Sequence, residues 1–91
     1  MLEVPDYLLC RISDELMEQP VILQSGFTYE KKEILRHFRF NGNNDPLTRQ
    51  EVDPTVLIPN KNIKQAIQDF LGSNPWAFEY IPGQQIADIQ M

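Results

Sequence analysis

Cysteine and histidine, the residues that build disulfides and structural zinc sites, are nearly missing from this 91-residue chain, which has only Cys10 and His37. One cysteine cannot form an intramolecular disulfide, and a structural zinc site needs about four such ligands. We therefore expect no disulfide and no metal, and the sequence indicates no cofactor. A single reduced thiol is typical of proteins in the cytoplasm and nucleus, where we expect this protein.

Long apolar runs and clusters of positive charge are also missing. No stretch of about 18 apolar residues occurs, and the first residues lack the pattern of a signal peptide, so we expect no membrane segment. The net charge is −5 with no block of lysine or arginine, which argues against binding to nucleic acid or to an anionic membrane surface.

Motifs for self-contained catalysis are absent, including those for nucleotide binding, metalloproteases and serine hydrolases. Cys10 and His37 could form a nucleophile–base pair, but a cysteine among apolar residues is more often a buried core residue. The carboxylates of Asp14, Glu15 and Glu18 are more typical of a solvated loop than of an acid–base pair. Chemistry carried by this chain alone is therefore not expected.

A short hairpin and a helix are indicated in the first half of the chain. The apolar run after Pro20 predicts a strand over 21–24, a turn at Ser25-Gly26 and a partner strand at 27–28. A helix is predicted over 29–40, with Thr28 as its N-cap and Glu30 in its first turn, where the helix dipole favours an acid.

The second half of the chain contains the clearest helical periodicity. Apolar residues recur at 63, 66, 67, 70 and 71, so a helix should begin after Asn60 as its N-cap and end just before Gly72. We expect Ile58, just before this helix, to lie in the core. The aromatic residues after it, starting with Trp76, should pack on the domain or on a second subunit.

Two loops, residues 10–19 (the first loop) and residues 41–49 (the second loop), mix apolar and polar side chains. Loops displayed on a small α+β scaffold are typical of a recognition module. The sequence in and around these loops resembles the U-box family over roughly residues 5–72. The resemblance rests on four blocks in order: Cys10-x-Ile12-Ser13-x-Glu15-Leu16-Met17-x-x-Pro20-Val21, Ser25-Gly26-x-Thr28-Tyr29, Asp45-Pro46-Leu47-Thr48-Arg49 and Leu57-Ile58-Pro59-Asn60.

The resemblance implies an α+β fold, the zinc-free RING-like U-box fold, with the two loops around a short β-hairpin and a central helix, plus a C-terminal helix. We expect the U-box domain at 1–72 and a C-terminal extension at 73–91, packed on the domain or at a dimer interface. The implied function is that of an E3 ubiquitin ligase module, whose partners are a ubiquitin-charged E2 conjugating enzyme and ubiquitin. The reacting thioester belongs to the E2, so no covalent intermediate forms on the U-box.

Five residues match family positions with a role in E2 docking. Ile12 and Pro46 match the apolar contacts of the two loops, and His37 matches a position at the rim of the E2 groove. Arg49 matches the residue that orients E2 and ubiquitin, a role that suits a rigid fork of five donors. Asp14 stands where chaperone-associated U-box ligases carry an aromatic residue that contacts the E2.

Three of these roles have a simpler alternative. Ile12 and Pro46 could be ordinary loop packing, and Arg49 could be a surface charge or a partner of Asp45 in a salt bridge. Arg11 stands where many U-boxes have proline. With Asp14, it leaves open a second interpretation, a U-box-like interaction or dimerisation module that does not activate an E2.

The residues flanking the box, 6–8 before it and 74–80 after it, are similar to those of the chaperone-associated U-box ligases. This similarity implies a role in protein quality control, with chaperone-bound clients held by a region that these 91 residues do not show. It also implies a homodimer.

Overall fold

The structure is a computed structural model that describes residues 3–80. Its elements follow the order 3-10 helix η1 (Asp6–Leu8), β1 (Pro20–Ile22), β2 (Thr28–Glu30), α1 (Lys31–Asn41), β3 (Ile58–Pro59), α2 (Lys61–Ser73) and 3-10 helix η2 (Pro75–Tyr80). The expected α+β class is confirmed. Part of the predicted extension, residues 81–91, lies outside the described residues.

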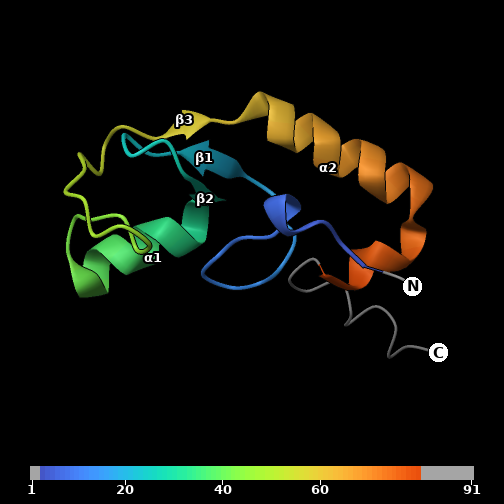
Figure 1. The fold of residues 1–91 in the computed structure, drawn as a ribbon, viewed down its shortest axis with the longest axis horizontal. Coiled ribbons are helices and arrows are strands. Elements are labelled where there is room, and N and C mark those ends of the chain that lie inside the picture. The colour runs from blue at the N-terminus through green and yellow to red at the C-terminus, as the bar shows by residue number, and fades with distance from the viewer. Residues whose placement is uncertain (1–2, 81–91) are drawn as a thin grey trace.

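A three-stranded antiparallel sheet with the order β2-β1-β3 forms the centre of the molecule. Figure 1 shows this sheet between the two helices, with α1 at one end of the long axis and α2 at the other. Strand β1 pairs Val21 with Tyr29 on one side and with Pro59 on the other. The sheet is short because Pro20 opens β1, and a hairpin turn at Ser25-Gly26 follows closely, with Gly26 at a φ of 93°.

The core lies where the sheet, the helices and the first loop meet. It contains Val4, Leu8, Cys10, Leu16, Met17, Val21, Leu23, Tyr29, Ile34, Phe38, Val52, Ile67 and Ala77. Trp76 packs against this cluster, and its ring meets that of Phe70 edge to face, with centroids 5.9 Å apart. Residues just after α2 therefore pack on the domain itself.

Helix α1 begins later than its sequence pattern predicts. Thr28 is not the N-cap, because β2 continues through Glu30 and the helix starts at Lys31. Glu30 is buried in the N-cap position rather than in the first turn, and its side chain does not cap the helix. The carboxylate instead binds the first loop, which overrides the local preference for a cap at Thr28.

Helix α2 begins as its sequence pattern predicts, but it ends one residue beyond Gly72. The Asn60 side chain accepts a hydrogen bond from the Ile63 N–H at 3.0 Å, so Asn60 is the N-cap. The predicted burial of Ile58 is wrong, since its side chain is 54% exposed. Ile58 pairs with Ile22 in the two-residue edge strand β3, where its side chain lies on the outer surface.

Candidate functional site

The tips of the two loops are closed by the same pair of backbone hydrogen bonds. In the first loop the Cys10 N–H donates to the Glu15 carbonyl at 2.9 Å, and the Asp14 N–H donates to the Cys10 carbonyl at 2.7 Å. In the second loop the same pattern runs from Asp45 to Gln50 at 2.8 Å and from Arg49 back to Asp45 at 2.7 Å. Each closure projects the residues between its ends outward, which exposes the apolar side chains of the loops.

Both closures place a non-glycine residue in the left-handed region. Asp14 has a φ of 58° and Arg49 a φ of 65°, and no other non-glycine residue within 3–80 has a positive φ. Aspartate tolerates this region through local hydrogen bonding of its short side chain, whereas arginine has no such compensation. Backbone strain of about 1–2 kcal/mol at such a residue is typical of functional sites.

A buried carboxylate ties the second loop to the hairpin. Asp45 is fully buried and accepts hydrogen bonds from the Tyr29 hydroxyl at 2.7 Å, from the Leu47 N–H at 2.7 Å and from the Ser25 hydroxyl. Burial alone raises the pKa of Asp45, but these hydrogen bonds and one from the Thr48 N–H outweigh it and hold the pKa below its ordinary value.

A second buried carboxylate ties the first loop to β2. One oxygen of Glu30 accepts hydrogen bonds from the Glu18 N–H at 2.7 Å and the Gln19 N–H at 3.0 Å. The Glu30 N–H in turn donates to the sulfur of Cys10, which is fully buried. Glu30 and Asp45 are the two buried charged residues within 3–80, and each holds one loop in place.

Two adjoining hollows bring four of the five predicted site residues together on one face. The first is lined by Ile12, Glu33, Arg36, His37, Phe40 and Asn41, and the second by His37, Asn41, Asn44, Pro46 and Arg49. We call the residues of both hollows the docking face. His37 and Asn41 belong to both hollows, so the last turns of α1 form the ridge that connects the two loops.

His37 holds this ridge to the second loop. Its Nε2 lies 3.0 Å from the Asn44 carbonyl oxygen and 3.1 Å from the Asn44 side-chain oxygen, so Nε2–H is the donor. Its Nδ1 lies 3.4 Å from the amide nitrogen of Asn41, which donates to it. The Cys10 sulfur instead accepts a hydrogen bond from the backbone N–H of Glu30, so Cys10 and His37 do not form the hydrogen-bonded pair that a thiol enzyme needs.

Asp14 and Arg49 have different surroundings. Asp14 is exposed and lines a separate hollow with Asp6, Leu9, Cys10 and Arg11, so it is not brought together with the other four residues. The guanidinium of Arg49 makes no ion pair with any residue of the 3–80 region. The simpler alternative for Arg49, a salt bridge to Asp45, is wrong. The only hydrogen bond from Arg49 to Asp45 runs from its backbone N–H to the Asp45 carbonyl, while the Asp45 carboxylate binds Ser25 and Tyr29.

Phe40 belongs to the docking face although no sequence motif identified it as a site residue. Its side chain is 69% exposed, the largest exposed fraction among the bulky apolar residues of the described region. Phe40 follows His37 by one helical turn, which is the signal that could have revealed it. With Ile12 at 38% exposed, it gives the first hollow two accessible apolar side chains.

Within the described part of the chain, no group of three or more histidine, cysteine or acidic side chains could hold a metal ion. No helix there is long and apolar enough to cross a bilayer. A further hollow lies elsewhere, between β1, β3 and the starts of the two helices.

Comparison with known proteins gives consistent matches. The U-box domain family matches residues 4–76. The chain is 47% identical over 77 residues to the E3 ubiquitin-protein ligase CHIP of Arabidopsis thaliana, covering 85% of this chain and 28% of that protein. It is 40% identical over 68 residues to WD repeat, SAM and U-box domain-containing protein 1 of Gallus gallus, covering 75% of this chain and 14% of that protein.

A solved structure with a similar fold is that of the RING finger-like domain of Retinoblastoma Binding Protein-6. The TM-score is 0.70 at 30% identity, over 76% of this chain and 78% of the other. This match confirms the RING-like architecture predicted from the sequence blocks.

Proposed function

Because this chain belongs to the U-box family, we propose that it is the domain of an E3 ubiquitin ligase that docks a ubiquitin-charged E2 conjugating enzyme. CHIP and PUB22 of Arabidopsis thaliana, 47% and 36% identical to this chain, are both named E3 ubiquitin-protein ligases. The chain spans 28% and 19% of these relatives, so substrate recruitment is assigned to other regions of a longer protein.

The observation that carries the proposal is the continuous docking face. Ile12 from the first loop, Pro46 from the second loop and His37 between them line two hollows that share residues. A few apolar anchors that become fully desolvated can dominate the affinity of a small interface. Ile12 and Phe40 are accessible, and their backbones are fixed by the closed first loop and by α1. Docking therefore needs little further ordering of the chain.

Arg49 is assigned a positioning role toward the E2-bound ubiquitin. Its guanidinium is exposed at the edge of the second hollow and makes no ion pair within 3–80, so its five donors stay available. Donors that bind carbonyl oxygens of E2 and ubiquitin together would favour the geometry in which the thioester is attacked. The U-box would thus accelerate transfer by orientation, and the covalent chemistry would stay on the E2.

We propose protein quality control as the setting, because the flanking residues resemble the chaperone-associated U-box ligases. Clients bound to a chaperone, a homodimer and a cytoplasmic and nuclear location all belong to this proposal. The client-binding region would lie in another part of a longer protein.

A binding titration tests the docking face. Labelled E2 enzymes of a broad panel are titrated with wild type, Ile12→Ala, Phe40→Ala and the matched control Leu35→Ala. Leu35 is 42% exposed on the same helix but lines neither hollow. We expect Ile12→Ala and Phe40→Ala each to weaken binding about tenfold and Leu35→Ala to leave it unchanged. Equal effects of all three variants would contradict the assignment.

The second candidate function is a U-box-like interaction module without productive E2 activation, favoured by the exposed acid at Asp14. On the ligase interpretation, Asp14 selects E2 enzymes that carry a basic patch. Asp14→Asn removes the charge and suits the observed φ of 58°, whereas Asp14→Phe places a bulky residue in the left-handed region. An E2 preference unchanged in Asp14→Asn would contradict this selection, and no activation of any E2 would favour the interaction module.

A further inference from the structure

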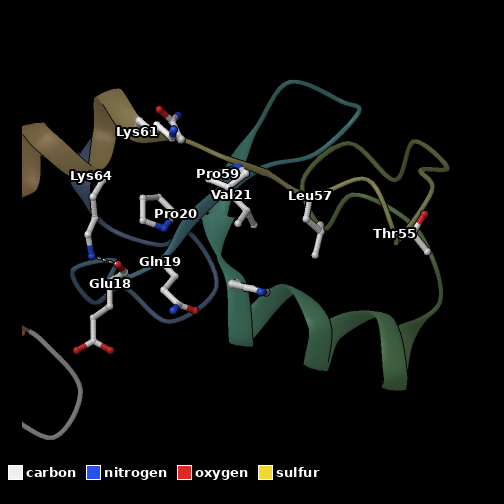
Figure 2. Close-up of a pocket in the computed structure, with 11 residues that line it drawn as sticks. Glu18, Gln19, Pro20, Val21, Thr55, Leu57, Pro59, Lys61 and Lys64 are labelled. Atoms are coloured by element: carbon white, nitrogen blue, oxygen red, sulfur yellow. Dashed lines mark hydrogen bonds between the residues drawn. The ribbon is translucent and has the colours of Figure 1, made fainter.

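A second hollow surface, which we call the basic groove, lies apart from the docking face and shares no lining residue with it. Figure 2 shows the groove between β1, the segment before α2 and the starts of both helices. It is lined by Glu18, Gln19, Pro20, Val21, Lys31, Thr55, Leu57, Pro59, Asn60, Lys61 and Lys64.

The floor of the basic groove is apolar. Pro20 and Val21 of β1 are buried beneath it, and Leu57 is half-buried beside them. Pro59 of β3 is exposed and adds a further apolar surface. Such a floor can accept aliphatic side chains of a ligand, which a simple patch of surface charge cannot do.

The rim of the groove carries three of the four lysines of the chain, Lys31, Lys61 and Lys64. The ammonium groups of Lys31 and Lys61 make no hydrogen bond or ion pair with any residue of the described region. That of Lys64 donates to the backbone carbonyl of Glu18, which leaves its other N–H groups available. Glu18 is the acidic residue of the rim, and Figure 2 shows its carboxylate pointing away from Pro20 and Val21.

The lysine positions are fixed by the backbone. Lys31 is the first residue of α1, and its N–H donates to the Gln19 carbonyl at 3.0 Å. Lys61 is the first residue of α2, and the preceding Asn60 N–H donates to the Pro20 carbonyl at 2.8 Å. Both helix starts are therefore tied to adjoining residues at the entry to β1, which places their lysines around one floor.

This arrangement of charge is unfavourable for the isolated domain. A helix start favours acids, yet the first turn of α2 has no acid and two lysines. The three lysines also gather like charge around one groove, in a protein whose net charge is −5. An anionic ligand would relieve both effects when it binds.

We propose that the basic groove docks a short, extended acidic segment of another protein, with its carboxylates on the three lysines and its aliphatic side chains on the apolar floor. Charge complementarity favours an acidic peptide. A long nucleic acid would meet the negative charge on the rest of the surface, whereas a short peptide only needs the groove. The proposal is independent of E2 docking, since the two surfaces share no residue.

The test uses the full chain and a fluorescent peptide in which aspartate or glutamate alternates with leucine or valine. Two control peptides replace the acids with lysine or the aliphatic residues with serine. We expect the triple variant Lys31→Gln/Lys61→Gln/Lys64→Gln to bind the first peptide about tenfold more weakly. Lys32→Gln, which alters the one lysine outside the groove, should bind as wild type does.

Three results would overturn the proposal. The first is that the acidic peptide does not bind wild type. The second is that the triple variant and Lys32→Gln lose peptide affinity equally. The third is that wild type binds a polyuridine oligonucleotide more strongly than the peptide. A melting curve of each variant checks folding, and Leu57→Ser provides a second variant that weakens binding through the floor while keeping every lysine. E2 activation by the triple variant should equal that of wild type, which separates this test from that of the proposed function.

Discussion

Arg49 combines a strained backbone with an unpaired charge in the described region, and the two features together point to a role outside the domain. A φ of 65° costs an arginine about 1–2 kcal/mol, and no contact of its guanidinium within 3–80 offsets that cost. A residue chosen for stability at this position would be glycine. The sequence motif indicated the role of Arg49, but the left-handed backbone could not be predicted, because nothing in an Asp-Pro-Leu-Thr-Arg block requires it.

We predict that Arg49→Gly stabilises the domain and removes its effect on ubiquitin transfer. Glycine relieves the left-handed strain, and after its own entropy cost the gain in unfolding free energy should be about 0.5–1 kcal/mol. Urea denaturation measures this gain, with Arg49→Ala as the control that keeps the strain. A lower unfolding free energy for the glycine variant than for the alanine variant would contradict the strain assignment.

The lowered pKa of Asp45 predicts how the stability of the domain depends on pH. Because hydrogen bonds hold its folded pKa below the ordinary value of 3.8, the ionised carboxylate stabilises the native state. That contribution is complete above the ordinary pKa and is lost as the pH falls through the lower folded pKa. The difference in unfolding free energy between wild type and Asp45→Asn should be largest near pH 7, at about 2 kcal/mol, and shrink below about pH 4. A constant difference across this range would contradict the assignment.

At the scale of elements, the start of α1 shows where local sequence signals fail. Thr28 and the acid two residues later have the pattern of a helix start, but Glu30 ends β2 and binds two backbone N–H groups of the first loop. Those donors are eleven and twelve residues away in the chain, so no local pattern reveals the contact. The helix of 61–73 was predictable because its periodicity and its Asn60 cap are both local.

We predict that Glu30→Ala loosens the first loop more than it disturbs α1. Two charge-assisted hydrogen bonds from Glu18 and Gln19 are lost, so the unfolding free energy should fall by about 2–3 kcal/mol. Hydrogen exchange at these two amides should accelerate well beyond exchange in the middle of α1. Glu51→Gln, at an exposed position, is the matched control and should change neither quantity. Unchanged protection of both amides in Glu30→Ala would show that the carboxylate does not hold the loop.

At the scale of the whole molecule, two buried carboxylates hold two loops against a short sheet. The order of the four sequence blocks was enough to predict the RING-like architecture, which the match to a solved RING finger-like domain confirms. The extension of the docking face to Phe40 had only a weak sequence signal, its spacing of one helical turn from His37. An exposed phenylalanine on a helix gains a role only when the fold places it beside Ile12 of the first loop.

The central claim is that the docking face binds a charged E2 and that Arg49 then accelerates transfer. The most direct measurement is single-turnover discharge of ubiquitin from a charged E2 to free lysine, with wild type, Ile12→Ala and Arg49→Ala. We expect wild type to accelerate discharge, Ile12→Ala to lose acceleration together with E2 binding, and Arg49→Ala to bind the E2 without accelerating discharge. No acceleration by wild type across a broad E2 panel, or full activity of Arg49→Ala, would contradict the claim.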